Sequence, residues 1–210
     1  MPIVTLVSGG IDSLVMYKIL RDQELEQLPL FIDYGQLSRQ KEWMACKTAF
    51  GEAGFGMPHR IELAGYGKSI RSGITDRDKD VYKEAFLPGR NLMFLVVGAS
   101  YAYYNDADGV AIGLLSEDTH LFPDQTEEFI VNANFAIDSA LGAYLTILAP
   151  LMGFSKRDVI RLADEYRLPI RLTYSCHAGN DVYCGECISC QEIIASGRQE
   201  SFTQFGERGD

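Results

Sequence analysis

A short apolar run that leads directly into a glycine pair constrains the fold of this chain most. Residues 3–7, Ile-Val-Thr-Leu-Val, are apolar and rich in β-branched side chains, as a buried parallel strand requires. Ser8-Gly9-Gly10 follows at once, and a helical pattern opens at Asp12-Ser13. Adjacent glycines let the backbone turn tightly and approach a ligand, and a helix start offers unpaired N–H groups to an anion. The segment therefore predicts a phosphate-binding turn between a first strand and a first helix.

A competing interpretation of this segment is an ordinary glycine turn in which Asp12 caps the helix. The Walker pattern is excluded, because no Gly-Lys-Ser or Gly-Lys-Thr follows the glycines. Ser8 and Ser13 add hydroxyl donors, and Asp12 is able to position a metal ion or a nucleotide. The complete hexapeptide at the first strand-to-helix turn favours phosphate binding over the simple turn.

Strand and helix patterns alternate along the rest of the chain. Apolar runs predict four more strands, at residues 28–33, 61–63, 109–115 and 145–148. Periodic apolar positions predict further helices at residues 38–53, 91–104, 127–141 and 155–166, and residues 65–89 are expected to form a long loop. This alternation predicts an α/β fold, a Rossmann-like parallel sheet with helices on both faces.

Three expectations concern packing. The helix at residues 91–104 is strongly apolar and is expected to be buried. The helix at residues 127–141 is expected to direct five side chains inward, those of Phe129, Ala133, Ala136, Ile137 and Ala140. The chain is expected to divide into a nucleotide-binding domain at residues 1–170 and a C-terminal four-cysteine segment at residues 171–210, which packs on the same domain.

The charge balance narrows the range of partners. The 210 residues carry a formal net charge of −10, which repels the nucleic-acid backbone and argues against a large nucleic-acid surface. No apolar run approaches the ~20 residues needed to cross a bilayer, and residues 1–7 lack the features of a signal peptide. We therefore expect no membrane association and a cytoplasmic location. Basic residues between Lys68 and Lys83 suit either an anionic small molecule or a solvated loop.

Four cysteines near the C-terminus have the spacing of metal ligands. Two residues separate Cys184 from Cys187 and Cys187 from Cys190, and Cys176 lies shortly before them. Such spacings bring four thiolates around one tetrahedral centre and leave no open position for a substrate, so a structural zinc site is expected. Disulfides are disfavoured in a cytosolic chain, and an iron–sulfur cluster uses the same ligands. Cys46 stands apart, on the apolar face of a predicted helix, as a core residue.

Several separate segments, spread over nearly the whole chain, resemble the 7-cyano-7-deazaguanine synthase family of PP-loop ATP pyrophosphatases. The hexapeptide at residues 8–13 resembles the Ser-Gly-Gly-x-Asp-Ser signature of PP-loop enzymes in general. Its combination with the other segments is specific to the synthases. These segments are Asp33-Tyr34-Gly35-Gln36, Pro88-Gly89-Arg90-Asn91 with Phe94-Leu95, Phe122-Pro123-Asp124 with Glu128-Phe129, Lys156 with Asp158, and Thr173-Tyr174-Ser175-Cys176 with the other cysteines.

The resemblance implies an adenine nucleotide alpha hydrolase-like fold and an ATP-dependent carbon–nitrogen ligase that uses ATP, Mg2+ and Zn2+. Family members adenylate the carboxylate of 7-carboxy-7-deazaguanine, release pyrophosphate, and let ammonia displace AMP to form an amide. A second adenylation, on the amide oxygen, allows elimination to the nitrile. Activation is required because a carboxylate is a poor electrophile, and donors around the phosphates stabilise the charge that develops. Related enzymes often form homodimers.

The resemblance also implies residue roles. Catalysis is assigned to Ser8, Asp12, Ser13 and Lys156. Nucleotide binding is assigned to Ser8, Gly9, Gly10, Asp12, Ser13, Asp33, Tyr34, Gly35 and Gln36. Substrate binding is assigned to Arg90, Asn91, Phe122, Pro123 and Asp124, and zinc binding to Cys176, Cys184, Cys187 and Cys190. The competing interpretations are a surface helix lysine for Lys156, a surface charge for Arg90 and a core aromatic for Phe122.

Two segments depart from the family pattern, and both belong to the half that would bind substrate. Leu37-Ser38 stands where the family usually has Arg-His, and Gln125-Thr126 stands where it usually has Cys-Arg. An alternative is therefore a paralogue that stops at the amide or joins the activated carboxylate to another amine, including one on a protein in antiviral defence. A non-catalytic nucleotide-binding module is the alternative from another class, and the intact turn at residues 8–13 argues against it. Thiolation of tRNA would require a basic surface, and this chain is acidic.

Overall fold

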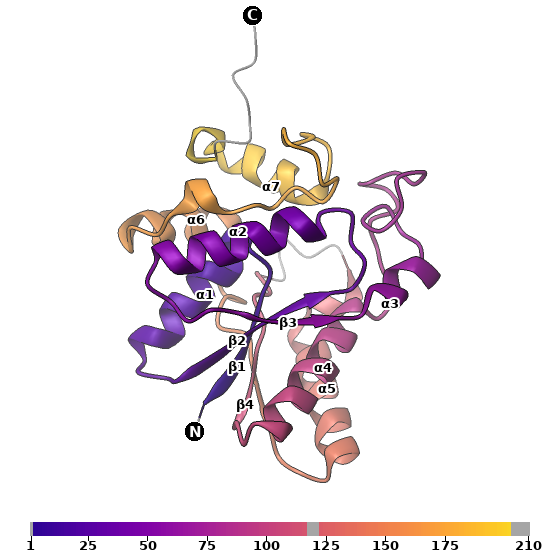
Figure 1. Cartoon of the computed structure of the whole chain (residues 1–210), viewed down its shortest axis with the longest axis vertical. Helices are drawn as coiled ribbons and strands as arrows, with labels where there is room; N and C mark the ends of the chain where they lie inside the picture. The colour runs from indigo at the N-terminus through magenta and orange to yellow at the C-terminus, as the bar shows by residue number, and fades with distance from the viewer. Residues whose placement is uncertain (1, 117–121, 203–210) are drawn as a thin grey trace, which may run out of the picture.

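The computed structural model describes residues 2–116 and 122–202 of the chain (Figure 1). Within these residues, five parallel strands form one sheet in the order β3-β2-β1-β4-β5. They are β1 (Ile3–Val7), β2 (Gln27–Asp33), β3 (His59–Glu62), β4 (Gly109–Ala111) and β5 (Thr146–Leu148). The strand order reverses between β1 and β4, and a crevice opens there because the connections leave in opposite directions. The predicted Rossmann-like parallel sheet is confirmed.

Helices cover both faces of the sheet, as predicted. Three lie on one face, namely α1 (Ile11–Asp22), α2 (Arg39–Glu52) and α6 (Lys156–Glu165), and two on the other, namely α4 (Arg90–Tyr104) and α5 (Glu127–Leu141) (Figure 1). The two-residue period of β1 divides its side chains between the two layers. Ile3 and Val7 pack toward the first group of helices, and Val4 and Leu6 toward the second. Both faces of β1 are therefore buried, which explains its continuous apolar sequence.

The structure corrects three expectations about element bounds. β4 ends at Ala111, earlier than predicted, although its neighbour β1 continues to Val7. Residues 65–89 are not a loop throughout, since a short helix, α3 (Ala64–Ser69), begins the segment. α3 escaped prediction because six residues with two glycines carry no apolar period. A further helix, α7 (Ile188–Ser196), follows the cysteines and was not expected.

The structure also corrects the expected burial of the outer helices. α4 is not buried all round, because Leu92, Val96 and Tyr103 are 39%, 46% and 56% exposed. In α5, Ala136 and Ala140 are exposed, and only part of the expected inward set is buried. The fully buried members of that set are Ala133 and Ile137. Each helix packs on the sheet with one face, and no further layer covers the opposite face of α4 or α5 within the described residues.

The C-terminal segment returns across the glycine turn. Tyr174 N donates a hydrogen bond to Gly9 O at 2.9 Å, and α7 packs against α6. Side chains of this segment share a hydrophobic cluster with Ile11 and Leu151, so the segment joins the main core. In Figure 1, α7 lies above α6 and α2, at the top of the molecule. No helix in the described ranges has the length and hydropathy needed to span a bilayer.

Candidate active site and metal centre

A cavity of about 270 Å³ opens at the carboxyl ends of β1, β2 and β4. Open parallel sheets bind ligands at this position, beside the point where the strand order reverses. The predicted site residues that line it are Ser8, Gly10, Asp12, Ser13, Tyr34, Gln36, Arg90, Asn91, Phe122 and Lys156. The predicted site residues that do not line it are Gly9, Asp33, Gly35, Pro123 and Asp124. One cavity thus brings together residues predicted for the nucleotide and residues predicted for the substrate.

The turn between β1 and α1 is fixed by its own hydroxyl groups. Ser8 N donates to Ser13 Oγ at 3.2 Å, Gly10 N donates to Ser8 Oγ at 3.3 Å, and Ser13 Oγ donates to Gly10 O at 3.0 Å. Gly9 has a φ of +79°, and a Cβ at this position would lie 2.2 Å from Glu42 O, so only glycine fits. The N-cap of α1 is Gly10 and no side chain caps the helix. The first N–H groups of α1 therefore have no side-chain acceptor beside the cavity.

Lys156 lies in the cavity wall between two carboxylates. Its Nζ lies 2.6 and 2.8 Å from the carboxylate oxygens of Asp12 and 3.3 Å from Glu192 Oε2. The lysine side chain is 8% exposed, so its interpretation as a surface lysine is wrong. Burial disfavours the ammonium form, but the nearby carboxylates outweigh burial and raise the pKa of Lys156. Asp12 pairs with Lys156 and does not cap α1, so the capping role considered for Asp12 is wrong.

Glu192 is a residue of this cavity that the sequence did not reveal. It lies on α7, two positions after Cys190, and burial raises the pKa of its carboxyl against the opposing effect of Lys156. Two carboxylates and one ammonium leave this part of the cavity with an excess negative charge. Carboxylate oxygens in excess beside the glycine turn are ligands that could hold a divalent cation. His177 also lines the cavity, and burial lowers its pKa to about 4, so the imidazole is neutral.

Residues 33–36, at the end of β2, divide between supporting and lining roles. Asp33 Oδ1 accepts from Gly35 N at 3.0 Å, and its Oδ2 lies 2.5 Å from Arg60 Nη2. Tyr34 and Gln36 line the cavity, and Gln36 Oε1 accepts from Tyr34 N at 3.0 Å. Burial raises the pKa of Tyr34 to about 12, so the phenol keeps its proton at neutral pH. Tyr34 and Gln36 are thus placed to contact a ligand, while Asp33 and Gly35 shape the turn.

Glu42, in the first turn of α2, is a second cavity residue that sequence reasoning missed. Its carboxylate accepts from Gln36 Nε2 at 2.8 Å and from Ser38 Oγ at 2.6 Å. Burial raises the pKa of Glu42, although these hydrogen bonds and the charge of Arg90 act in the opposite direction. The sequence signal was slight, because acidic residues are common in the first turn of any helix.

The predicted substrate residues reach the cavity from the start of α4 and from the segment before α5. Arg90, Asn91 and Phe122 line it. Asn91 N donates to Asp124 Oδ2 at 3.3 Å, and Asn91 Nδ2 donates to Asp124 O at 2.8 Å. Asp124 therefore holds Asn91 in place, and it lies with Pro123 in a short 3-10 helix, η2 (Pro123–Gln125).

The four residues that depart from the family pattern have different surroundings. Gln125 lines the cavity, and its Oε1 accepts from Phe122 N at 3.0 Å. Ser38 donates to Glu42, as described above, and Thr126 caps α5 by accepting from Phe129 N at 3.1 Å. Leu37, Ser38 and Thr126 do not line the cavity. The departure that touches the cavity is therefore Gln125, which stands where the family usually has a thiol.

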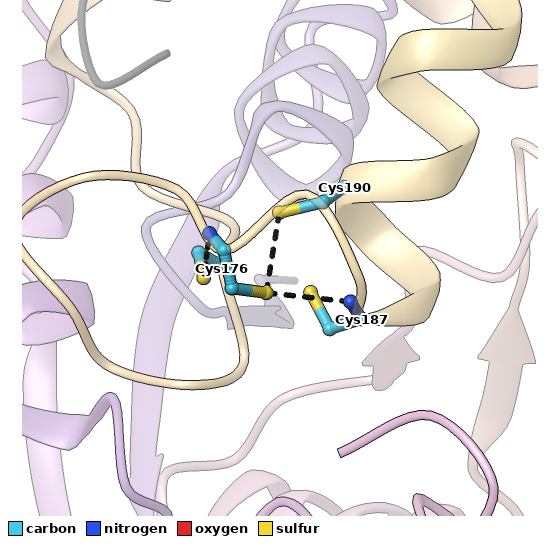
Figure 2. Close-up of side chains that lie close together, drawn as sticks. Cys176, Cys187 and Cys190 are labelled. Carbon is cyan, nitrogen blue, oxygen red and sulfur yellow. Dashed lines mark hydrogen bonds between the residues drawn. The ribbon is translucent and has the colours of Figure 1, made fainter. Parts of the chain in front are cut away.

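The four cysteines of the C-terminal segment gather at one point. Their Sγ atoms all lie within 4.8 Å of one another, and those of Cys184 and Cys190 are 3.9 Å apart. Figure 2 shows the side chains of Cys176, Cys187 and Cys190 close together. Tetrahedral metal–sulfur bonds of about 2.3 Å require sulfur atoms roughly 3.8 Å apart. The cluster is therefore able to hold one metal ion.

Comparison with known proteins establishes the family. The family described as "Queuosine biosynthesis protein QueC" matches residues 2–206. The chain belongs to the QueC family. It is 32% identical over 202 residues to a 7-cyano-7-deazaguanine synthase of Methanothermobacter thermautotrophicus, covering 89% of this chain and 90% of that relative. A 7-cyano-7-deazaguanine synthase of Persephonella marina is 32% identical over 211 residues, covering 93% and 92% of the two chains.

Solved structures share the fold at lower sequence identity. A predicted subunit of tRNA methyltransferase from Methanocaldococcus jannaschii has a TM-score of 0.57 at 20% identity, over 79% of this chain and 76% of that one. The U34-tRNA thiolase NcsA from Methanococcus maripaludis, solved with its 4Fe-4S cluster, has a TM-score of 0.56 at 16% identity, over 96% and 68% of the chains. These similarities concern the fold alone. Membership of the QueC family places the chain among the ATP-dependent PP-loop enzymes.

Proposed function

We propose that this QueC-family enzyme converts 7-carboxy-7-deazaguanine, through the amide, to 7-cyano-7-deazaguanine. In each of two rounds, an oxygen of the substrate attacks the α-phosphorus of ATP and pyrophosphate leaves. Ammonia displaces AMP from the first adduct to give the amide, and AMP carries away the amide oxygen of the second adduct as the nitrile forms. The observation that carries the proposal is one cavity that joins the glycine turn and Lys156 to Arg90.

The glycine turn and Lys156 serve the nucleotide in this proposal. The first N–H groups of α1 and the hydroxyls of Ser8 and Ser13 bind phosphate oxygens, where the charge of the leaving pyrophosphate develops. Lys156 is buried and held in place before ATP arrives, so its charge needs little reorganisation during the reaction. Asp12 and Glu192 offer the carboxylate oxygens that Mg2+ prefers, and Mg2+ when bound would neutralise phosphate charge.

Arg90, Asn91 and Phe122 serve the substrate. A guanidinium is able to bind a carboxylate through two parallel hydrogen bonds, which suits Arg90 to the acid group before its activation. The ring of Phe122 offers an apolar surface on which a planar base stacks. Asn91 adds an amide whose orientation Asp124 fixes.

We also propose that the cysteine cluster holds zinc. Structural zinc sites with four thiolates are tetrahedral, and the sulfur separations fit one such ion. An iron–sulfur cluster distributes its four thiolates over two or more iron atoms, and thiolates on different iron atoms lie farther apart than the ligands of a single ion. Residues 171–210 then form a metal-bound segment that packs on the nucleotide-binding unit of residues 1–170. We further propose that the enzyme is cytoplasmic, because thiols stay reduced in the cytoplasm.

The outer surface of α4 supports the expectation of a homodimer. The helix has no charged side chain after Arg90 and exposes Leu92, Val96 and Tyr103. Phe135, on the adjacent α5, is 72% exposed. Two copies of a chain with a net charge of −10 repel each other across charged surfaces, so an apolar face without charges suits a second copy.

Incubation with 7-carboxy-7-deazaguanine, ATP, Mg2+ and ammonia tests the proposed activity. Mass spectrometry should detect the nitrile, and chromatography should detect AMP and pyrophosphate. ADP as the main nucleotide product would refute adenylation, and no nucleotide cleavage would refute the substrate. Release of AMP with the amide, or a conjugate with another amine, as the end product would favour the paralogue. Gln125 is the observation that supports this second candidate, because it replaces a thiol at the cavity wall.

A further inference from the structure

Among the residues that the structure describes, two charged side chains that line the cavity have no partner of opposite charge. Within residues 2–116 and 122–202, neither Glu42 nor Arg90 lies within 4.0 Å of an oppositely charged group. Arg90 lies near enough to act on Glu42, because its charge opposes the effect of burial on the pKa of Glu42. In contrast, the other acidic and lysine side chains of the cavity are paired with one another. These are Asp12, Lys156 and Glu192.

The carboxylate of Glu42 retains capacity for further hydrogen bonds. An ionised carboxylate offers about four lone-pair sites. Gln36 Nε2 occupies one site at 2.8 Å, and Ser38 Oγ occupies another at 2.6 Å. Both donors are neutral, and Tyr34 N in turn fixes the orientation of the Gln36 amide. The carboxylate is therefore held in place without a cation beside it, and a ligand that brings N–H donors would stabilise it.

We propose that Glu42 recognises the hydrogen-bond donor edge of the substrate base while Arg90 binds its carboxylate. This inference rests on the proposed function. A guanine-type base presents a ring N–H next to an exocyclic amine, and the two oxygens of a carboxylate match these neighbouring donors. 7-Carboxy-7-deazaguanine carries this edge and its acid group on different sides of one rigid ring. Glu42 is then a specificity-determining residue for guanine-type deazapurines.

The adenine of ATP matches Glu42 less well. Its exocyclic amine lies beside a ring nitrogen that accepts hydrogen bonds and does not donate them. A carboxylate that faces this edge meets one donor and one lone pair, so repulsion offsets part of the attraction. A base with two adjacent donors satisfies both open sites of Glu42.

The test compares two substrates that differ by one amine. AMP release is measured with 7-carboxy-7-deazaguanine and with its analogue that lacks the exocyclic amine, for the wild type, Glu42→Gln and Glu52→Gln. Glu52 is exposed at the far end of α2 and controls for the change from carboxylate to amide. We expect the wild type to prefer the amine-bearing substrate by about 10- to 100-fold in kcat/KM, the scale of one charge-assisted hydrogen bond. Glu42→Gln should reduce this preference to a few-fold, and Glu52→Gln should retain it.

Equal kcat/KM values for the two substrates in the wild type would overturn the inference without any variant. A Glu42→Gln enzyme that keeps the full preference would also overturn it. So would a variant that instead loses the preference for ATP over inosine triphosphate, because Glu42 would then contact the nucleotide. In each of these outcomes the wild type still releases AMP, so the proposed function stands. No AMP release from 7-carboxy-7-deazaguanine by the wild type would refute the proposed function, and this inference with it.

Discussion

Replacing Lys156 with methionine tests how the proposed site handles phosphate charge. Methionine keeps an unbranched apolar stem but removes the ammonium, which lies 2.6 and 2.8 Å from Asp12 and 3.3 Å from Glu192. The two carboxylates lose the cation between them, and the phosphates of ATP lose a positive charge. The free energy of unfolding and kcat/KM should both fall, by different amounts.

The effect on stability follows from the exposure of the two carboxylates. Removing one partner of a fully buried ion pair costs about 3–5 kcal/mol. The side chains of Asp12 and Glu192 are 29% and 30% exposed, so water in the cavity screens their charges. We therefore expect Lys156→Met to reduce the free energy of unfolding by about 1–2 kcal/mol. For a chain of this length the corresponding fall in Tm is roughly 2–8 °C.

The effect on catalysis should be larger. One lost hydrogen bond to a charged group costs about 1.5–3 kcal/mol, which corresponds to roughly 10- to 100-fold in rate. An ammonium has three donors, so we expect kcat/KM for AMP release to fall by about 100-fold or more. Arg157→Met, at the next and exposed position of α6, is the control and should change kcat/KM less than about twofold. A folded Lys156→Met enzyme with wild-type AMP release would refute the assignment of Lys156 to phosphate chemistry.

Four further predictions concern the turn, the metal, the fifth cysteine and the dimer. Asp12→Ala should lower AMP release by about 100-fold or more without unfolding the chain, because it removes a cavity carboxylate and no core contact; wild-type turnover would contradict this. Elemental analysis should find one zinc per chain, and Cys187→Ser should lower both zinc content and Tm, because metal-binding energy contributes to folding; protein without zinc would contradict the site. Burial raises the pKa of Cys46 to about 12, so its thiol stays protonated at pH 8 and should react with a disulfide reagent only after unfolding. Removal of the metal with a chelator should expose the other four thiols to the reagent. Rapid labelling of all five thiols in the folded protein would contradict this prediction. Phe135→Asp should convert a dimer to a folded monomer in sedimentation, since this side chain is 72% exposed and makes no core contact within the described part of the chain; a monomeric wild type would contradict this prediction.

The glycine turn could be predicted because its signal lies within consecutive residues. A buried strand, two glycines and a helix start are each local features, and the positive φ of Gly9 is the conformation that glycine tolerates. The start of the helix predicted at residues 155–166 is likewise a local signal, and Ser155 caps this helix by accepting from Asp158 N at 3.3 Å. The cysteine cluster could be predicted because the short spacings between the cysteines keep their thiols close together.

Glu42 and Glu192 could not be identified as cavity residues, because only tertiary packing gives them that position. Lys156 and Asp12 are 144 positions apart, and Glu192 joins them from a third helix. No pattern within a short stretch of sequence predicts a contact among three separate helices. The prediction that α4 is buried was wrong for a related reason. An apolar sequence indicates that a helix packs against other elements, but it does not tell on how many of its faces they lie. Leu92 is exposed for this reason.

The C-terminal segment contributes to the cavity wall as well as to stability. Tyr174 N donates a hydrogen bond to Gly9 O, and so connects the segment to the backbone of the glycine turn. Residues of the segment that line the cavity are Tyr174, Ser175, His177, Ile188, Ser189 and Glu192. The proposed boundary after residue 170 therefore separates two sequence patterns, while the cavity needs side chains from both.

A metal ion at the cysteine cluster would fix the position of this wall. α7 begins directly after Cys187 and contains Cys190, so two of the four sulfur ligands determine where the helix starts and how it is rotated. Glu192 lies half a turn beyond Cys190 and reaches Lys156 at 3.3 Å. A tetrahedral ion admits little variation in the positions of its ligands. The zinc that we propose would thus hold the second carboxylate of the phosphate site in place without contacting either substrate, and a structural metal would become a requirement for adenylation.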